Sequence, residues 1–296
     1  MAVSTASAPE LTAEQVQKIL ILPLEDKSVI LSSGVRNFPT NGSPVRIPKL
    51  GGPVADPGWT GENEPIPERD VDFGEVLLLP ETMKSIKVIT RFSNELARQA
   101  IVALDAVLQA RLVKDVADKF DQAFISGDGN DGGAPLTSPL GLLNMAGTQE
   151  MLTVGVPSLD DLHDADGLVL GADVDPTKVR WFLTSRDFIA LRKIKDTQER
   201  YQIQPDPTQA GVYVLLGHPV TITNRVPANG GVGTNESSIV LADMSQVAVA
   251  RDLAPSVTIL RERYADYDQQ AIRVVARYDI GALNAEAIVV LRAVTL

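Results

Sequence analysis

Three glycines in the middle of the chain have a spacing that could support nucleotide chemistry. Gly127, Gly129 and Gly132 match a dinucleotide-binding fingerprint, in which backbone amides and a helix N-terminus hold a pyrophosphate. The fingerprint must follow a strand and open a helix. Here the glycines follow a helical pattern and end it. We therefore interpret them as a helix stop and not as a nucleotide site.

Two other groups of residues could in principle bind a cation. Asp128 opens a loop with further oxygen ligands, but an EF-hand beginning there would place Gly132 fifth and Pro139 twelfth, so the ligand spacing fails. His163 lies in a stretch rich in aspartate, which we interpret as a solvated helix face because a metal site needs ligands that converge on one point. Its neighbours are Asp160, Asp161, Asp164 and Asp166.

Nucleophilic chemistry also lacks support in the sequence. The chain has no cysteine, which excludes disulfides, thiolate catalysis and zinc sites built on sulfur. No serine occupies a G-x-S-x-G turn. We interpret Trp181 as a core residue, His218 as a structural residue in a turn, and the pair Arg186 and Asp187 as surface or interface charges. The pattern favours a structural protein over an enzyme and predicts neither a cofactor nor a metal.

Composition describes an acidic globular protein of 296 residues with a formal net charge of -11. Hydrophobic residues make up 44%, enough for a real core. An acidic surface repels phosphate backbones, so tight or sequence-specific binding of nucleic acid is disfavoured. The first residues lack the pattern of a signal peptide, and no apolar run is long enough to span a bilayer. We expect a protein made in a cytoplasm, without a membrane partner.

The strongest local pattern is a long amphipathic helix. Ser93 is a good N-cap, and apolar residues recur every three or four positions from there to about Ser126. The helix would be about 50 Å long. Two strands are expected before it, at Val71–Leu79 and Lys84–Phe92. They could be joined tightly at Pro80–Thr82, or the first could pair with Val45–Leu50 in a long ribbon.

The remaining elements alternate without a repeating βαβ unit, which predicts an α+β fold. A short helix near Ala13–Leu20 and a capped helix at Ser158–Leu170 are expected. Ser185 is expected to cap a helix that runs to about Lys195. The residues between Gly127 and Asn144 are expected to form a loop. The expected strands are Val179–Leu183, Val212–Leu216, Val220–Thr223, Ile239–Ala242, Val247–Ala250, Val257–Glu262, Ala271–Asp279 and Ala287–Ala293.

The tract from Ser43 to Asp70 is polar and broken by proline and glycine, so it cannot build a core of its own. It nevertheless carries a lone tryptophan, Trp59, among acidic residues. Such a tract is either disordered or an arm that lies on a neighbouring subunit, and the rest of the chain favours the arm.

Several stretches together carry a family resemblance. The first is GWTGENEPIPERDVDFGEVLLLPETMKSIKVITRFSNEL, from Gly58 to Leu96. The others are Phe120–Gly129 with Ser138–Asn144, Val179–Pro205 with Val212–Pro227, and Ile239–Asp252 with Ile272–Arg292. In order and spacing they resemble the major capsid proteins of tailed bacteriophages with the HK97-type fold.

The resemblance implies a division of the chain into four parts. These are an N-terminal arm (residues 1–42), an extended E-loop hairpin (43–80), a P-domain (81–139 and 253–282, with a spine helix at about 94–126) and an A-domain (140–252 and 283–296). It also implies hexamers and pentamers that form an icosahedral shell around phage DNA. An encapsulin-like nanocompartment shell, which shares the fold, is the alternative.

The implied partners are other copies of the chain, and possible further partners are a separate scaffolding protein, a portal and a decoration protein. Because the chain starts close to the E-loop, we expect no large scaffolding segment within it. We expect Lys49, Lys84 and Lys87 to be ordinary solvated lysines and not crosslinking residues. The candidate residues for contacts between subunits are Trp59, Glu62, Glu64, Arg69, Arg36 and Arg46.

Overall fold

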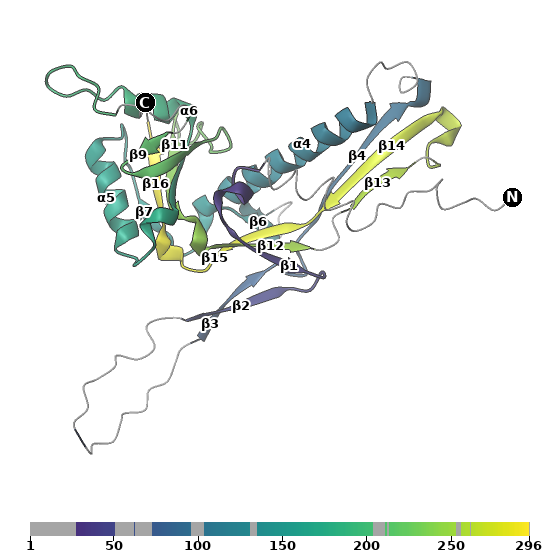
Figure 1. Ribbon diagram of the computed structural model, residues 1–296, viewed down its shortest axis with the longest axis horizontal. Coiled ribbons are helices and arrows are strands. Elements are labelled where there is room, and N and C mark those ends of the chain that lie inside the picture. Colours follow the sequence, from purple (N-terminus) through teal and green to yellow (C-terminus); the bar gives the residue numbers. More distant parts are fainter. Residues whose placement is uncertain are drawn as a thin grey trace.

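The computed structural model describes residues 28–50, 62, 73–95, 104–130, 135–203, 211, 213–252, 256–260 and 262–295. Figure 1 shows three regions: a unit of sheet and helices, an elongated unit built on the long helix α4, and a two-stranded ribbon that projects away from both. This arrangement of helices and sheets is the α+β architecture that the sequence predicted. No helix in the described ranges is long and apolar enough to cross a membrane.

The elongated unit combines α4 (Leu104–Ser126) with a three-stranded sheet of order β13-β14-β4. Its strands are β13 (Ser256–Leu260), β14 (Gln269–Ala276) and β4 (Ile86–Ser93). Ser93 Oγ accepts a hydrogen bond from the Glu95 amide at 3.2 Å, as expected of a helix N-cap. Residues 96–103 of the predicted spine helix lie outside the described residues.

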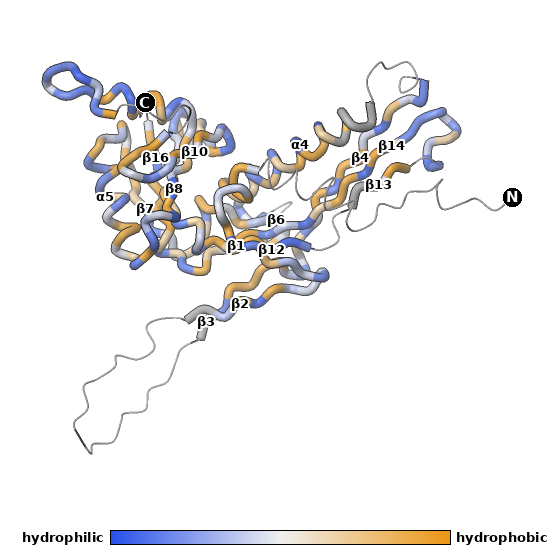
Figure 2. The backbone as a smooth tube through the Cα atoms, viewed as in Figure 1, coloured by the Kyte–Doolittle hydropathy of each residue, from blue (hydrophilic) through white to orange (hydrophobic). Residues whose placement is uncertain are grey.

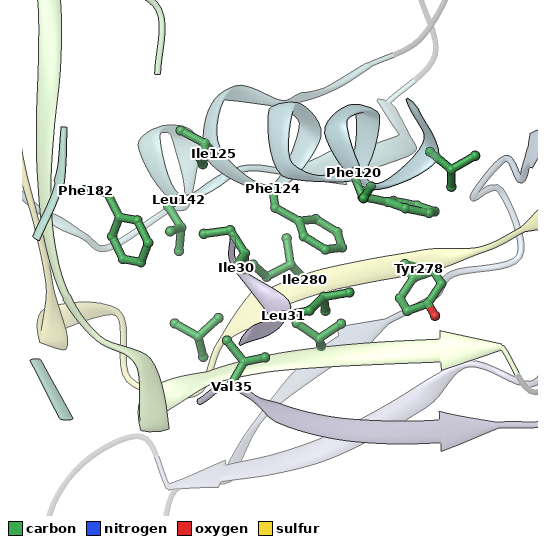
Figure 3. Packing of buried hydrophobic residues seen from close by; sticks show 14 of the residues in the cluster. Ile30, Leu31, Val35, Phe120, Phe124, Ile125, Leu142, Phe182, Tyr278 and Ile280 are labelled. Atoms are coloured by element: carbon green, nitrogen blue, oxygen red, sulfur yellow. The ribbon is translucent and has the colours of Figure 1, made fainter. Parts of the chain in front are cut away.

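The apolar face of α4 forms the main core. Phe120 and Phe124 are buried and stack with ring centroids 5.7 Å apart, and Phe120 also contacts Tyr278 at 4.7 Å. Ile30 and Leu31 enter the same cluster from the N-terminal side (Figure 3). Figure 2 shows the hydrophobic residues along the inner side of the helix and its neighbouring strands. The helical spacing of apolar residues in the sequence therefore identified the face that is buried.

The second unit is a six-stranded sheet of order β7-β16-β11-β8-β10-β9. Two helices, α5 (Leu159–Leu170) and α6 (Ser185–Arg192), pack into the apolar cluster around the buried Trp181. Ser158 caps α5 in a full capping box, as expected. The strands are β7 (Gln149–Met151), β8 (Val179–Leu183), β9 (Val214–Leu215), β10 (His218–Ile222), β11 (Ser237–Asp243) and β16 (Ile288–Val294).

Two details of this unit differ from the sequence prediction. The N-cap of α6 is Thr184 and not Ser185, because the Thr184 side chain accepts from the Asp187 amide, and the helix ends at Arg192 and not Lys195. His218 lies in strand β10 and not in the turn before it. The parallel pairing of β8 with β10 makes a βαβ unit with α6, and no second pair of adjacent parallel strands is joined by a single helix in the described part of the chain.

A small sheet of order β1-β12-β15 lies at the junction of the two units and the ribbon. It consists of β1 (Arg36–Thr40), β12 (Val247–Asp252) and β15 (Tyr278–Ala282). The single strand expected at Ala271–Asp279 is in fact two strands, β14 and β15, which pair in different sheets. Arg277 separates them, so the chain passes from the elongated unit into the junction at this residue.

The ribbon is formed by β2 (Val45–Leu50) and β3 (Phe73–Leu78), which pair antiparallel from Val45 opposite Leu78 to Leu50 opposite Phe73. Of the two alternatives for the first strand, the pairing with Val45–Leu50 is therefore confirmed and the tight connection to the next strand is wrong. The region expected to be a loop after α4 contains a hairpin of β5 (Asp128–Asn130) and β6 (Pro135–Leu140).

Short 3-10 helices complete the described elements, and the short helix expected near Ala13–Leu20 lies outside the described residues. They are η3 (Leu31–Ser33), η4 (Leu142–Asn144), η5 (Pro176–Lys178), η6 (Met244–Gln246), η7 (Ala265–Tyr267) and η8 (Ala285–Ala287).

Candidate subunit-contact site

The feature that most clearly reaches beyond the body of the molecule is the β2–β3 ribbon (Figure 1). Its base is packed into a small apolar cluster in which Leu78, Leu79 and Met83 contact Ala248 and Ala250 of β12. Farther out, the described side chains of Val45–Pro48 and Glu75–Leu77 are half-buried or exposed. The ribbon is thus anchored at one end and free of the body at the other, which is the geometry expected of an arm.

Asp279 holds the inner end of the ribbon. Its Oδ2 accepts a hydrogen bond from the Leu79 amide at 2.7 Å, and its Oδ1 accepts from the Ile280 amide at 2.9 Å. Leu79 has a left-handed backbone with φ of 53°, an uncommon conformation for a non-glycine residue. Burial raises the pKa of Asp279 to about 6, although both amides and the nearby Arg277 act to lower it.

Two neighbours make this anchor rigid. Arg277 Nη2 donates to the Pro80 carbonyl at 2.7 Å, and the Met83 amide donates to the same carbonyl at 2.9 Å. A Cβ atom on Gly281 would lie 2.7 Å from Leu78 Cδ2, so a larger residue here would force the buried Leu78 side chain to move. The direction of the ribbon is therefore set by buried contacts and not by its exposed residues.

The candidate contact residues from the sequence fall partly inside the described residues. Arg36 is exposed at the start of β1, and Glu62 is exposed. Arg46 is exposed on β2, and its Nη1 lies 3.5 Å from Glu75 Oε2 across the ribbon. Arg36, Arg46 and Glu62 form no ion pair with one another. Trp59, Glu64 and Arg69 lie outside the described residues, so the role of the group stays a prediction.

The sequence did not indicate the residue that holds the N-terminal segment. Asp121 on α4 accepts from Ser28 Oγ at 2.5 Å, from the Val29 amide at 2.8 Å and from the Ile30 amide at 3.2 Å. Burial raises its pKa despite these hydrogen bonds. The sequence shows only that an aspartate lies on an otherwise apolar helix face. That pattern does not predict which residues bind the aspartate.

The interpretation of Asp187 as a surface charge is wrong. Its side chain is fully buried, and its Oδ2 accepts from Thr184 Oγ1 and Ser237 Oγ, each at 2.7 Å. Arg186 Nε lies 3.2 Å from the other oxygen. The network ties α6 to strand β11, so it is a structural element of the six-stranded sheet.

The described residues include the candidate metal ligands that the sequence suggested around His163. No group of three or more histidine, aspartate or glutamate side chains gathers within them to hold a metal. Asp166, one of the four aspartates near His163, instead lies 2.9 Å from His218 Nε2, where it joins α5 to β10. A groove of about 220 Å³ at the ribbon base is lined mainly by apolar residues.

Comparison with known proteins agrees with this architecture. The model of the phage capsid family matches residues 11–293. The major capsid protein of Klebsiella oxytoca phage phiKO2 is 26% identical over 311 residues, which cover 98% of this chain and 69% of that protein. The major capsid protein of Halomonas phage phiHAP-1 is 25% identical and matches 79% of this chain, which spans only 35% of the relative's length.

Solved structures show the same fold at low sequence identity. The capsid of a native GTA particle superposes with a TM-score of 0.69 at 15% identity, covering 100% of this chain and 96% of that one. Microbacterium phage Oxtober96 gives a TM-score of 0.69 at 16% identity, covering 89% and 90%. With a family model that spans nearly the whole sequence, the chain belongs to the phage capsid family.

Proposed function

We propose that this chain is a phage major capsid protein, a structural subunit that assembles through hexamers and pentamers into an icosahedral shell around phage DNA. The observation that carries the proposal is the β2–β3 ribbon, which is anchored at Asp279 and extends away from its own body. An arm of this kind contributes little to the stability of a single copy. Burial of the outer part of the ribbon on a neighbouring copy would explain why the chain builds such an arm.

The contact residues belong to the same proposal. We assign Trp59 the role of anchor of the arm in this proposal, because large aromatic side chains contribute most to buried interfaces. Glu62, Glu64, Arg69, Arg36 and Arg46 supply charged contacts around it. The division into an N-terminal arm, E-loop, P-domain and A-domain at the predicted boundaries is also part of the proposal.

The other partners in this proposal are those that a shell filled with DNA would need. A net charge of -11 suits contact with packaged DNA that has to move, because the acidic subunit does not hold the phosphates tightly. A separate scaffolding protein, a portal and a decoration protein complete the particle. The subunit is made in the host cytoplasm, acts in the virion and performs no catalysis.

Electron microscopy of the purified full chain tests the proposal. The unaltered protein should form rings, sheets or shells, and Trp59→Ala should abolish them while the subunit stays folded. Tyr267→Ala is a matched control, because Tyr267 is an aromatic residue that is 75% exposed at a different place on the molecule. A protein that stays monomeric at high concentration would contradict the proposal, as would shells that form equally well without Trp59.

Boiling the assembled particles in detergent tests the expectation about lysines. The chain should run as a single band, because the lysines near the arm are expected to be solvated. A ladder of covalent oligomers would contradict this expectation. Shells that enclose a cargo enzyme in place of DNA would favour the encapsulin-like alternative.

A further inference from the structure

Helix α5 and the turn after it form a strongly acidic surface. Every formally charged residue between Ser158 and Thr177 is an aspartate. Asp161 is used within the helix cap and Asp166 contacts His218. The exposed remainder, which we call the acidic face, consists of Asp160, Asp164, Asp173 and Asp175.

The segment after α6 has the opposite character. Residues 192–202, which we call the basic hairpin, carry a positive net charge, with four basic residues against the two acidic residues Asp196 and Glu199. The basic residues are Arg192, Lys193, Lys195 and Arg200. Lys195 pairs with Tyr201 in an antiparallel bridge, and the Lys195 Nζ lies 5.3 Å from the centre of the Tyr201 ring. Figure 1 shows the segment that follows α6 extending beyond the sheet.

The basic hairpin is held in shape by its own hydrogen bonds. Asp196 accepts from the Gln198 amide at 2.8 Å, from the Arg200 amide at 2.9 Å and from Arg200 Nε at 3.0 Å. The hydrogen bond from the Arg200 amide is the main reason that the pKa of Asp196 is lowered. Because Asp196 is occupied in this way, Lys193 and Lys195 form no ion pair with the described residues and remain available for a partner.

The two charged surfaces belong to different parts of the same sheet. The acidic helix α5 packs over β11 and β16. The basic hairpin follows α6, whose Phe188 ring lies 5.0 Å from the Tyr213 ring, next to the edge strand β9. No ion pair joins the acidic face to the basic hairpin within the described part of the chain. Within the described residues of a single copy, Asp160 and Asp164 of the acidic face form no ion pair, and neither do Lys193 and Lys195 of the basic hairpin. Arg200 of the hairpin is already paired with Asp196.

We propose that the basic hairpin of one copy docks on the acidic face of the next copy around a ring. A ring is built from head-to-tail contacts, so each copy must present two different and mutually complementary surfaces. Opposite charges also steer the copies into this arrangement, although their net charge of -11 makes them repel overall. This inference rests on the proposed function, since it assigns one of the contacts within the ring.

Charge reversal tests the contact on the full chain. Lys193→Glu with Lys195→Glu, and separately Asp160→Lys with Asp164→Lys, place like charges together at every ring contact. Each double variant should raise the concentration needed for half-assembly at least about tenfold. A chain that carries all four substitutions should assemble as the unaltered protein does. Since a folding defect would persist in the fourfold variant, this rescue separates lost contact from lost fold.

Mixing the two double variants gives a sharper result. A copy with two acidic surfaces and a copy with two basic surfaces complement each other only when they alternate. Alternation satisfies every contact in a ring of even number and leaves one unsatisfied in a ring of odd number. The mixture should therefore form hexamers, but neither pentamers nor closed shells, when viewed by electron microscopy.

The matched control is Lys114→Glu with Lys119→Glu, which makes the same change in net charge on the exposed face of α4. It should assemble normally. The proposal is overturned if this control is impaired as strongly as the hairpin variant, or if the fourfold variant fails to assemble. It is also overturned if the hairpin variant assembles normally and loses only its binding to a short DNA duplex. Failure of the unaltered chain to assemble would instead count against the proposed function.

Discussion

Asp279→Asn should change how the stability of the subunit depends on pH. Asp279 is only 5% exposed and holds the end of the ribbon through the amides of Leu79 and Ile280. Burial raises its pKa from 3.8 to about 6, and Arg277 is the charged group that faces it. Asparagine keeps the shape of the side chain but does not titrate, so the variant isolates the effect of the charge.

The pKa sets the size of the effect. The folded-state pKa lies above the unfolded value, so the native subunit binds more protons between about pH 4 and pH 6. The stability that the protonated Asp279 side chain contributes is fully present below that pH interval. It is lost as the pH rises through about 6. The rise in pKa corresponds to about 3 kcal/mol. In the Asp279→Asn variant, the side-chain NH2 group replaces one of the two acceptor oxygens and faces a backbone N–H. The backbone donor left unpaired lowers the free energy of unfolding of the variant by about 1–3 kcal/mol.

Urea unfolding of the unassembled subunit between pH 4 and pH 8 measures this effect, with the fluorescence of the buried Trp181 as reporter. The useful quantity is the difference in free energy of unfolding between variant and parent. Asp121, whose pKa is also raised, cancels in that difference because both chains contain it. The difference should shift by about 2.5 kcal/mol in favour of the variant from pH 4 to pH 7, because Asp279 in the unfolded chain is already partly ionised at pH 4.

A difference that stays constant within about 0.5 kcal/mol across this range would refute the reasoning. It would mean that Asp279 is solvated in the folded subunit and does not feel the burial described above. Asp266→Asn serves as control, because Asp266 is exposed in η7. The profile of this control should run parallel to that of the parent.

Three further substitutions test the packing, and a fourth, Gly167→Ala, serves as a control. Asp121→Ala removes the acceptor for Ser28 and two amides, and should cost about 2–5 kcal/mol and speed proteolysis near Ser28. Gly281→Ala pushes a Cβ against Leu78 and should lower the free energy of unfolding by about 1–3 kcal/mol. Gly167→Ala, where a Cβ on helix α5 would meet open space, should raise the free energy of unfolding by up to about 1 kcal/mol. Phe124→Ala should cost about 3–5 kcal/mol in thermal unfolding. A neutral result for Asp121→Ala, Gly281→Ala or Phe124→Ala would contradict the contacts assigned to that residue.

Local patterns predicted the elements well where the physical cause is local. The α4 helix and the capped α5 helix depend on apolar spacing and on a cap within a few residues, and both are present. The strand Val179–Leu183 was predicted with the bounds that the structure has. The misplaced cap of α6 shows the usual limit, since Thr184 and Ser185 are chemically equivalent candidates and only the backbone decides between them.

Pairing over long distance was harder to predict. The chain breaks between β14 and β15 because the two strands belong to different sheets. β14 pairs with β13 and β4, whereas β15 pairs with β12. The alternating stretch from Ala271 to Asp279 reads as one strand, and Arg277 within it does not by itself mark a change of partner. The burial of Asp187 was missed for a similar reason, because its compensating hydroxyl groups come from Thr184 and from the distant Ser237.

The sequence by itself determined the long helix, the acidic character and the arm-like composition of the tract around Trp59, because these properties depend on residue type and short-range spacing. Together with the family resemblance they pointed to a shell protein. Only the tertiary structure decided that Asp279 anchors the ribbon and that Asp121 holds the N-terminal segment. In both cases the partners lie far apart along the chain, and burial in the folded state gives an ordinary carboxylate its role.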